Sequence, residues 1–280
     1  MTRPEELSVD ATQDLAVFAQ SIRIDVLRMV HRAKSSHIGS CFSIAEILAV
    51  LYGRVLNVDP VRPYKCDRDR FILSKGHACA ALYSALATRG FFPRDWLDEF
   101  YRDGSKLPGH ATHTVPGVEV STGSLGHGLS IACGMALVGK QETKSFRVFT
   151  LLSDGECDEG SVWEAVLFAG HHRLDNLVAI VDANKIQSLG RMSEVLNLEP
   201  LCDKWRASRW SVREVDGHNV LAIKDALANV PFEAHSPSCL ITNTTKGRGV
   251  SFMQDDLLWH YRSPNDQEFA DALSELKAAV

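Results

Sequence analysis

The hydrophobic pattern of the chain predicts strands that alternate with helices. Residues 148–152 and 177–181 are mainly apolar runs of strand length, and residues 160–174 between them are typical of a helix. A right-handed crossover of this kind sets the two strands parallel, with their C-terminal ends at one edge of a sheet. We therefore predict an α/β fold: a doubly wound, mostly parallel sheet with helices on both faces.

Further elements are predicted along the rest of the chain. Apolar side chains at helical spacing indicate a first helix over 11–34, followed by a loop over 35–40. Ser43 is expected to cap the next helix, with Glu46 three residues later completing a capping box. We predict further helices at 43–56, 77–89, 93–101, 129–140, 220–228 and 267–279, and strands at 69–73, 210–215 and 239–244. No linker or repeat divides them, so residues 1–280 are expected to form one domain.

Polar residues follow both of the first two strands. Asp154 comes directly after one strand, and Asn184 follows the other within Asp182-Ala183-Asn184. Because the strand ends lie at one edge, both side chains can converge on one ion. Mg²⁺ takes few protein oxygens and completes its octahedron with phosphate oxygens and water, so we predict an anchor for a diphosphate. Strand-end Asp and Asn are also common turn residues, so this pair alone leaves that alternative open.

A glycine- and histidine-rich segment over 104–128 interrupts the regular pattern. A long loop of this kind inside a compact domain is usually functional. Residues 123–128 do not give the G-x-G-x-x-G spacing of a dinucleotide site, and residues 245–249 do not form a Walker loop. These glycines therefore do not indicate a nucleotide-binding site.

Composition limits the classes of partner. The net charge of −5 gives no electrostatic case for nucleic acid or an anionic membrane. No apolar run approaches the roughly 20 residues of a membrane span, and residues 1–6 are too polar for a signal peptide. Seven dispersed cysteines fit a reducing compartment. We expect a cytoplasmic protein with neither a nucleic-acid nor a membrane partner.

Five blocks of sequence, in order and over essentially the whole chain, resemble transketolases. They are Ser36-His37-Ile38-Gly39, the block from Cys66 to Tyr83, Leu107-Pro108-Gly109-His110, the block from Gly117 to Gly128, and Trp259-His260. The second block contains Asp69-Arg70-Phe71, Leu73-Ser74 and Gly76-His77-Ala78, a characteristic pattern of that family. The similarity is to the diphosphate-binding domain, which is the N-terminal part of the longer enzymes.

This resemblance implies the cofactors and their residues. Asp154, Asn184 and the backbone carbonyl of Ile186 would hold Mg²⁺, for which Ca²⁺ or Mn²⁺ can substitute, and with it thiamine diphosphate. Cofactor-binding roles are implied for His77, Gly123, Leu125, His127, Gly155, Glu159, Asn184 and His260. Catalytic roles toward the donor sugar are implied for His37, His110 and His260. Imidazole titrates near neutral pH and can relay protons to sugar oxygens, although any one histidine taken alone could equally be structural.

Three departures from the family pattern concern specificity. Ser153 replaces a glycine of the metal motif, and Ala183 and Lys185 flank Asn184 where acidic or small residues are common. Tyr261 follows His260 where glycine is usual, which could narrow the donor channel. Because the ligand positions are retained, we expect altered specificity rather than loss of the cofactor.

The resemblance also implies a partner. No segment resembles the pyrimidine-binding domain, whose glutamate activates the cofactor, or the arginine cluster that grips a sugar phosphate. We expect a separately encoded C-terminal transketolase subunit, an α₂β₂ assembly, and transfer of a two-carbon ketol unit from a ketose or ketose phosphate to an aldose. Two alternatives stay open: a subunit of another thiamine diphosphate enzyme that uses 2-oxoacids, and a non-catalytic paralogue that binds the partner.

Overall fold

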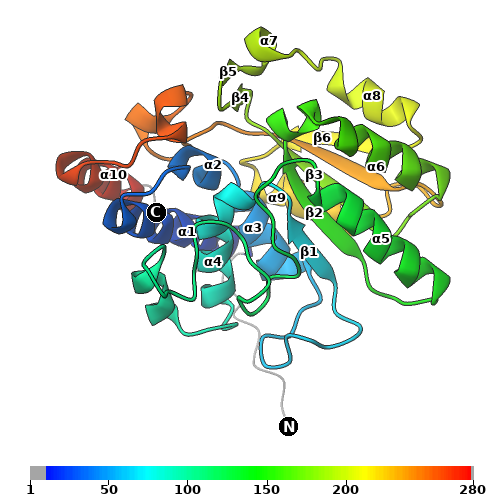
Figure 1. Ribbon diagram of the computed structural model, residues 1–280, viewed down its shortest axis with the longest axis horizontal. Helices are drawn as coiled ribbons and strands as arrows, with labels where there is room; N and C mark the ends of the chain where they lie inside the picture. The colour runs from blue at the N-terminus through cyan, green and yellow to red at the C-terminus, as the bar shows by residue number, and fades with distance from the viewer. Residues whose placement is uncertain (1–10, 279–280) are drawn as a thin grey trace.

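A five-stranded parallel sheet forms the centre of the computed structural model, which describes residues 11–278 (Figure 1). Its strands are β1 (Arg70–Leu73), β2 (Val148–Ser153), β3 (Leu177–Ala183), β6 (Ser211–Asp216) and β7 (Ser238–Asn243). They lie in the order β1-β2-β3-β7-β6, and every neighbouring pair is parallel. The central strands β2 and β3 are buried on both faces, which explains their almost continuous apolar sequence. The predicted α/β fold is confirmed.

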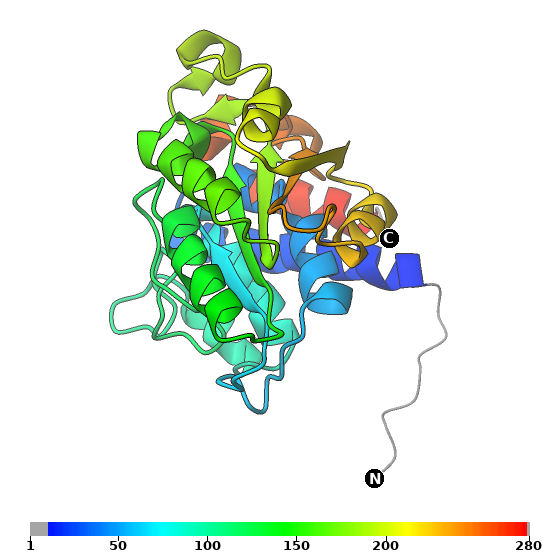
Figure 2. The ribbon, with the colours of Figure 1, turned by 90° about the vertical axis from the view of Figure 1, so that its right-hand side faces the viewer.

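Helices cover both faces of this sheet (Figure 1 and Figure 2). One layer contains α5 (Gly128–Gln141), α6 (Gly160–His171) and α8 (Leu201–Ala207), and the other contains α1 (Ala11–Ala33), α3 (Ala45–Val50), α4 (Cys79–Thr88) and α9 (Val220–Ala228). Successive residues of β3 alternate between the layers, so Val178 and Ile180 pack in one core while Ala179 and Val181 pack in the other.

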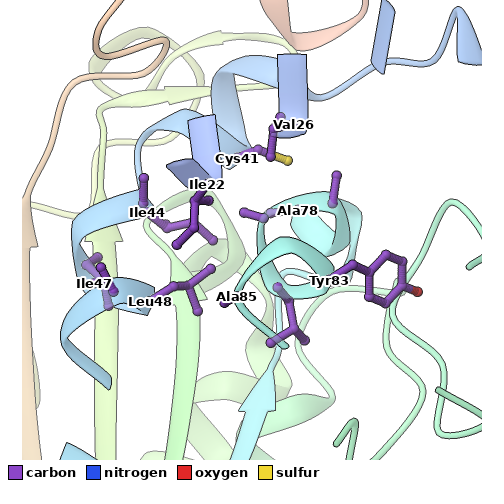
Figure 3. Close-up of a cluster of buried hydrophobic side chains, with 14 of the residues drawn as sticks. Ile22, Val26, Cys41, Ile44, Ile47, Leu48, Ala78, Tyr83 and Ala85 are labelled. Atoms are coloured by element: carbon purple, nitrogen blue, oxygen red, sulfur yellow. The ribbon is translucent and has the colours of Figure 1, made fainter. Parts of the chain in front are cut away.

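The larger core lies under α1, α3 and α4. Figure 3 shows Ile22 of α1 near Ile44 and Leu48, and Val26 of α1 near Cys41, all of them buried. The C-terminal helix α10 (Asp266–Ala278) packs against α1. Among residues 11–278, no helix combines the length and apolar character that a membrane crossing requires.

The sequence did not indicate several short elements. These are α2 (Ile38–Phe42), which begins inside the predicted 35–40 loop, the hairpin β4 (Ile186–Gln187) with β5 (Gly190–Arg191), α7 (Met192–Val195), and α8. The 51–55 segment is a π-helical turn, and short 3₁₀ helices occupy 76–78, 94–99, 155–158, 251–253 and 257–260. Residues 1–6 and position 279, which the sequence analysis also considered, lie outside the described residues.

The predicted capping box of Ser43 and Glu46 is wrong. Helix α3 begins after Ile44, and the Ser43 hydroxyl instead donates to Asp182 Oδ2 at 2.7 Å. Glu46 accepts from Arg23 at 2.6 Å and lies 3.1 Å from His218 Nδ1. Both side chains are buried, so long-range polar contacts determine their positions in place of the local cap.

Strand register brings the candidate site together. Ser153 of β2 lies opposite Asp182 of β3, and the Asp154 amide continues the pairing by donating to the Asp182 carbonyl at 3.1 Å. Asp154 and Asn184 therefore leave the sheet at the same edge.

We predict that replacing Glu46 by alanine will lower the free energy of unfolding by about 3–5 kcal/mol, because it leaves the buried Arg23 guanidinium without its carboxylate. Denaturant unfolding of the purified chain measures this. Glu99→Ala is the matched control, since its pair with Arg102 is exposed and should contribute less than about 1 kcal/mol. Equal losses of unfolding free energy in both variants would contradict a stabilising role of the buried Arg23–Glu46 pair.

Candidate active site

A pocket of about 200 Å³ opens at the edge where β1, β2 and β3 end. Ten of the predicted site residues line it: His37, His77, His110, Gly123, Leu125, Asp154, Gly155, Asn184, Ile186 and His260. The pocket also contains Ser40, Lys75, Ser153, Gln187, Ser188 and Lys246. Segments that are far apart in the sequence thus meet at the sheet edge that the strand pattern indicated.

Two predicted residues are not among those that line the pocket. His127 is exposed directly before α5, and Glu159 is exposed directly before α6. The implied roles of both residues at the cofactor stay predictions.

The three expected metal ligands are held together by backbone hydrogen bonds. Asp154 accepts from the Gly155 amide at 2.8 Å and from the Lys185 amide at 2.5 Å, which brings its carboxylate against the segment after β3. Asn184 Oδ1 accepts from the Ile186 amide at 3.1 Å. The Ile186 carbonyl accepts from Lys246 Nζ at 2.8 Å, so an ammonium is bonded to the oxygen that a metal ion would use.

Electrostatics at Asp154 favour a cation. Burial and the neighbouring Asp182 raise the pKa of the Asp154 carboxyl to about 6. Within the described part of the chain, no ion pair neutralises this carboxylate. A divalent ion would supply the missing positive charge, and a carboxylate, an amide oxygen and a carbonyl are the hard ligands that Mg²⁺ prefers. The residues present therefore fit a magnesium site completed by phosphate oxygens and water.

Lys75 and Asp182 were not identified from the sequence. Their side chains are fully buried and pair at 2.6 Å. Burial raises the pKa of the Asp182 carboxyl, but the Lys75 charge and several hydrogen bonds outweigh it and hold the pKa below its usual range. The available signal was a charged residue close to the end of each of two buried strands: Lys75 is two residues beyond β1, and Asp182 is the last residue but one of β3. A charged side chain buried at such a place usually requires a partner.

Lys246 was also missed. It is buried at the pocket wall, where its ammonium contacts the Ile186 carbonyl and lies 2.9 Å from His260 Nδ1. Burial and then the nearby Lys75 lower its pKa to about 8. Lys75 is already paired with Asp182, whereas Lys246 forms no ion pair among residues 11–278, so the Lys246 ammonium is suited to an anionic group such as a diphosphate.

Four histidines surround the pocket. The His37 ring centroid lies 5.0 Å from that of His77, 5.1 Å from that of His260 and 6.1 Å from that of His110. Burial, together with nearby basic groups, lowers the pKa of His37 to about 4 and that of His260 to about 3, and it holds the pKa of His77 well below its ordinary value. At neutral pH these three rings are therefore neutral and offer hydrogen bonds rather than charge.

The loops that carry the histidines depend on close backbone contacts. A side chain at Gly76 would place its Cβ 2.4 Å from the Thr122 carbonyl oxygen, so glycine is required where the two loops cross. His37 adopts a left-handed backbone, with φ of 72°, and its amide donates to the His260 carbonyl at 2.9 Å. These contacts fix the four rings around one cavity.

Comparison with known proteins agrees with this geometry. A sequence model of the family described as "Transketolase, thiamine diphosphate binding domain" matches residues 15–275. One of the subunits of apulose-4-phosphate transketolase from Phocaeicola vulgatus is 38% identical, over 96% of this chain and 95% of its own length. The 6-deoxy-6-sulfo-D-fructose transketolase subunit SqwG of a Clostridium species is 42% identical, over 94% of this chain and 96% of its own length.

Solved structures give the same result. The structure of transketolase from Leishmania mexicana superposes with a TM-score of 0.88 at 30% identity, covering 94% of this chain and 41% of that longer chain. Transketolase of Rattus norvegicus, 39% identical, is matched over 92% of this chain and 41% of its own length. The chain therefore belongs to the transketolase family and corresponds to its thiamine diphosphate-binding domain.

Proposed function

We propose that the chain is the N-terminal subunit of a two-component transketolase, which transfers a two-carbon ketol unit from a ketose or ketose phosphate to an aldose. The observation that carries this is the convergence of Asp154, Asn184 and the Ile186 carbonyl with four histidines in one pocket. The relatives named as transketolase subunits support the division into two chains, because this chain matches nearly their whole length.

We assign different residues of the pocket to the cofactor and to the substrate. Asp154, Asn184 and the Ile186 carbonyl would hold the metal, and His77, Gly123, Leu125 and Gly155 would contact thiamine diphosphate. Bound there, the cofactor would supply the nucleophilic carbon and the electron sink that the reaction requires. The chain's own residues would orient the cofactor and hold the metal.

His37, His110 and His260 would act at the donor sugar. His260 Nδ1 accepts from the Lys246 ammonium at 2.9 Å, which leaves its Nε2–H to donate to a sugar hydroxyl. His37 Nδ1 lies 3.0 Å from Ser36 Oγ, so its Nε2 is the nitrogen that would bind the sugar. These rings would then relay protons from an uncharged resting state, through their hydrogen bonds to the sugar hydroxyls. His110 is more exposed than the other three histidines of the pocket.

The partner would be a separately encoded C-terminal transketolase subunit that brings a glutamate to the cofactor, in an α₂β₂ assembly. Tyr261, whose hydroxyl donates to the Ser188 carbonyl at 2.8 Å beside the pocket, would narrow access for the donor. Both statements rest on the family resemblance and on the relatives named as subunits.

We expect the chain, combined with its partner subunit, to form ketol-transfer product from ketoses or their phosphates only when Mg²⁺ and thiamine diphosphate are present. Asp154→Ala should abolish this activity at ordinary Mg²⁺ concentrations, because the metal loses its carboxylate ligand. The control is Asp203→Ala, which alters an exposed carboxylate on α8. A donor panel of ketose phosphates, pyruvate and branched 2-oxoacids measures the specificity. Turnover of 2-oxoacids alone would overturn the transketolase assignment, and no turnover of any donor would favour a non-catalytic paralogue.

We also expect a pH-dependent contribution of His260 to stability. Between about pH 6.5 and 3 the unfolded chain binds a proton at this residue that the folded chain excludes, so the contribution is full above pH 6.5 and is lost as pH falls. Between pH 7 and pH 5, the free energy of unfolding should therefore fall less for His260→Asn than for the unsubstituted chain. Denaturant unfolding at each pH measures this. His171→Asn, at an exposed histidine of α6, should follow the unsubstituted chain. Parallel curves for all three proteins would contradict the buried neutral state of His260.

A further inference from the structure

The carboxylate of Asp182 lies next to the pocket lining and accepts four side-chain hydrogen bonds. It is completely buried at the end of β3 and accepts hydrogen bonds from Ser43 Oγ at 2.7 Å, Lys75 Nζ at 2.6 Å and Asn184 Nδ2 at 2.9 Å, all at Oδ2. Thr244 Oγ1 donates to the other oxygen. Asp182 does not line the pocket itself, so it meets the cavity only through Lys75 and Asn184, which do.

The Asn184 amide is hydrogen-bonded at both of its ends. A carboxylate only accepts hydrogen bonds, so Asp182 selects the NH₂ group of Asn184. The Ile186 amide only donates, so it selects the Oδ1 atom at 3.1 Å. Rotating the amide by 180° would set a donor against a donor at Ile186 and an acceptor against an acceptor at Asp182.

We propose that Asp182 is a positioning residue that fixes the Asn184 amide so that its oxygen is presented to the metal ion. This deepens the proposed function and rests on it, because Asn184 is one of the proposed metal ligands. An asparagine binds Mg²⁺ only through its oxygen, and an unrestrained amide would spend part of its time with the NH₂ group in that position. Lys75 allows Asp182 to be buried beside Asn184, because a buried Asp182 carboxylate without a positive partner would strongly destabilise the folded chain.

A purely structural role for the Lys75–Asp182 pair makes a different prediction. The pair also links the segment before α3, through Ser43, and the end of β1, through Lys75, to the central strand β3. If that link were the whole role, removing the pair would change stability but would leave the metal affinity of folded protein unchanged. The hydrogen bond to Asn184 is the contact that separates the two roles.

Two charge-neutral double variants isolate that contact. K75M/D182N removes the ion pair but keeps an oxygen that can accept from Asn184 Nδ2, whereas K75M/D182L replaces it with an apolar side chain of similar shape. Replacing both members of a buried ion pair by uncharged groups is commonly tolerated, which favours folding of both variants. Because both lack Lys75, any direct effect of that lysine on the cofactor cancels in the comparison.

The measurement is the dissociation constant of Mn²⁺ from the chain assembled with thiamine diphosphate and its partner subunit, followed by electron paramagnetic resonance of free Mn²⁺. We expect K75M/D182L to bind Mn²⁺ about 10- to 100-fold more weakly than K75M/D182N. At saturating Mn²⁺, both variants should bind thiamine diphosphate equally well. A variant with a damaged fold would not recover this binding. Equal Mn²⁺ affinities would overturn the role of Asp182 while leaving the proposed function intact. Absence of Mn²⁺ binding by the unsubstituted complex would instead overturn the metal site and this inference with it.

A second measurement covers the case in which K75M/D182L does not fold. In the unsubstituted chain, the Asn184 side-chain amide protons, assigned in nuclear magnetic resonance spectra by their loss in Asn184→Ala, should exchange slowly with solvent. Their protection follows from the buried bond to Asp182. Rapid exchange would show that the amide is not held and would overturn the proposal.

Discussion

The parallel pairing of β2 with β3 is the constraint on which the rest of the site depends. Its register sets Ser153 opposite Asp182, so the residues that follow, Asp154 and Asn184, leave the sheet side by side. A shift of one residue in this pairing would turn the buried side chains of one strand to the opposite face of the sheet and would offset the two strand ends that carry Asp154 and Asn184. The buried apolar side chains of both strands fix this register from two cores at once.

Charge at the pocket is arranged around that edge. Two buried carboxylates, Asp154 and Asp182, lie beside two buried lysines, Lys75 and Lys246, and only the Lys75–Asp182 pair forms a direct salt bridge. Asp154 and Lys246 are left with raised and lowered pKa values respectively, as expected for groups that lack their full complement of opposite charge. A magnesium diphosphate would satisfy both, since it presents a cation to the carboxylate and an anion to the ammonium.

Local pattern predicted the elements and the location of the site, but not the partners of its buried charges. Each of the apolar runs of β2 and β3 is followed by a polar residue, and this was sufficient to predict that Asp154 and Asn184 lie close together. The family resemblance predicted which histidines belong to the site. Ser43 and Glu46 were assigned to a local cap because their partners, Asp182 and Arg23, are distant in sequence. Lys75 and Lys246 were missed for the same reason. Helix α8 was missed because its short length between polar loops gives too weak a periodic signal, although Trp205 anchors it in the core.

The proposed function depends on one ion being held by Asp154, Asn184 and the Ile186 carbonyl. Crystals of the chain grown with thiamine diphosphate and Mn²⁺ test this through the anomalous scattering of manganese. We expect a single strong peak bonded to both side-chain oxygens and to the Ile186 carbonyl, with Lys246 Nζ displaced from that carbonyl toward the diphosphate. A peak elsewhere in the pocket, or an Asn184 oxygen turned away from the ion, would contradict it.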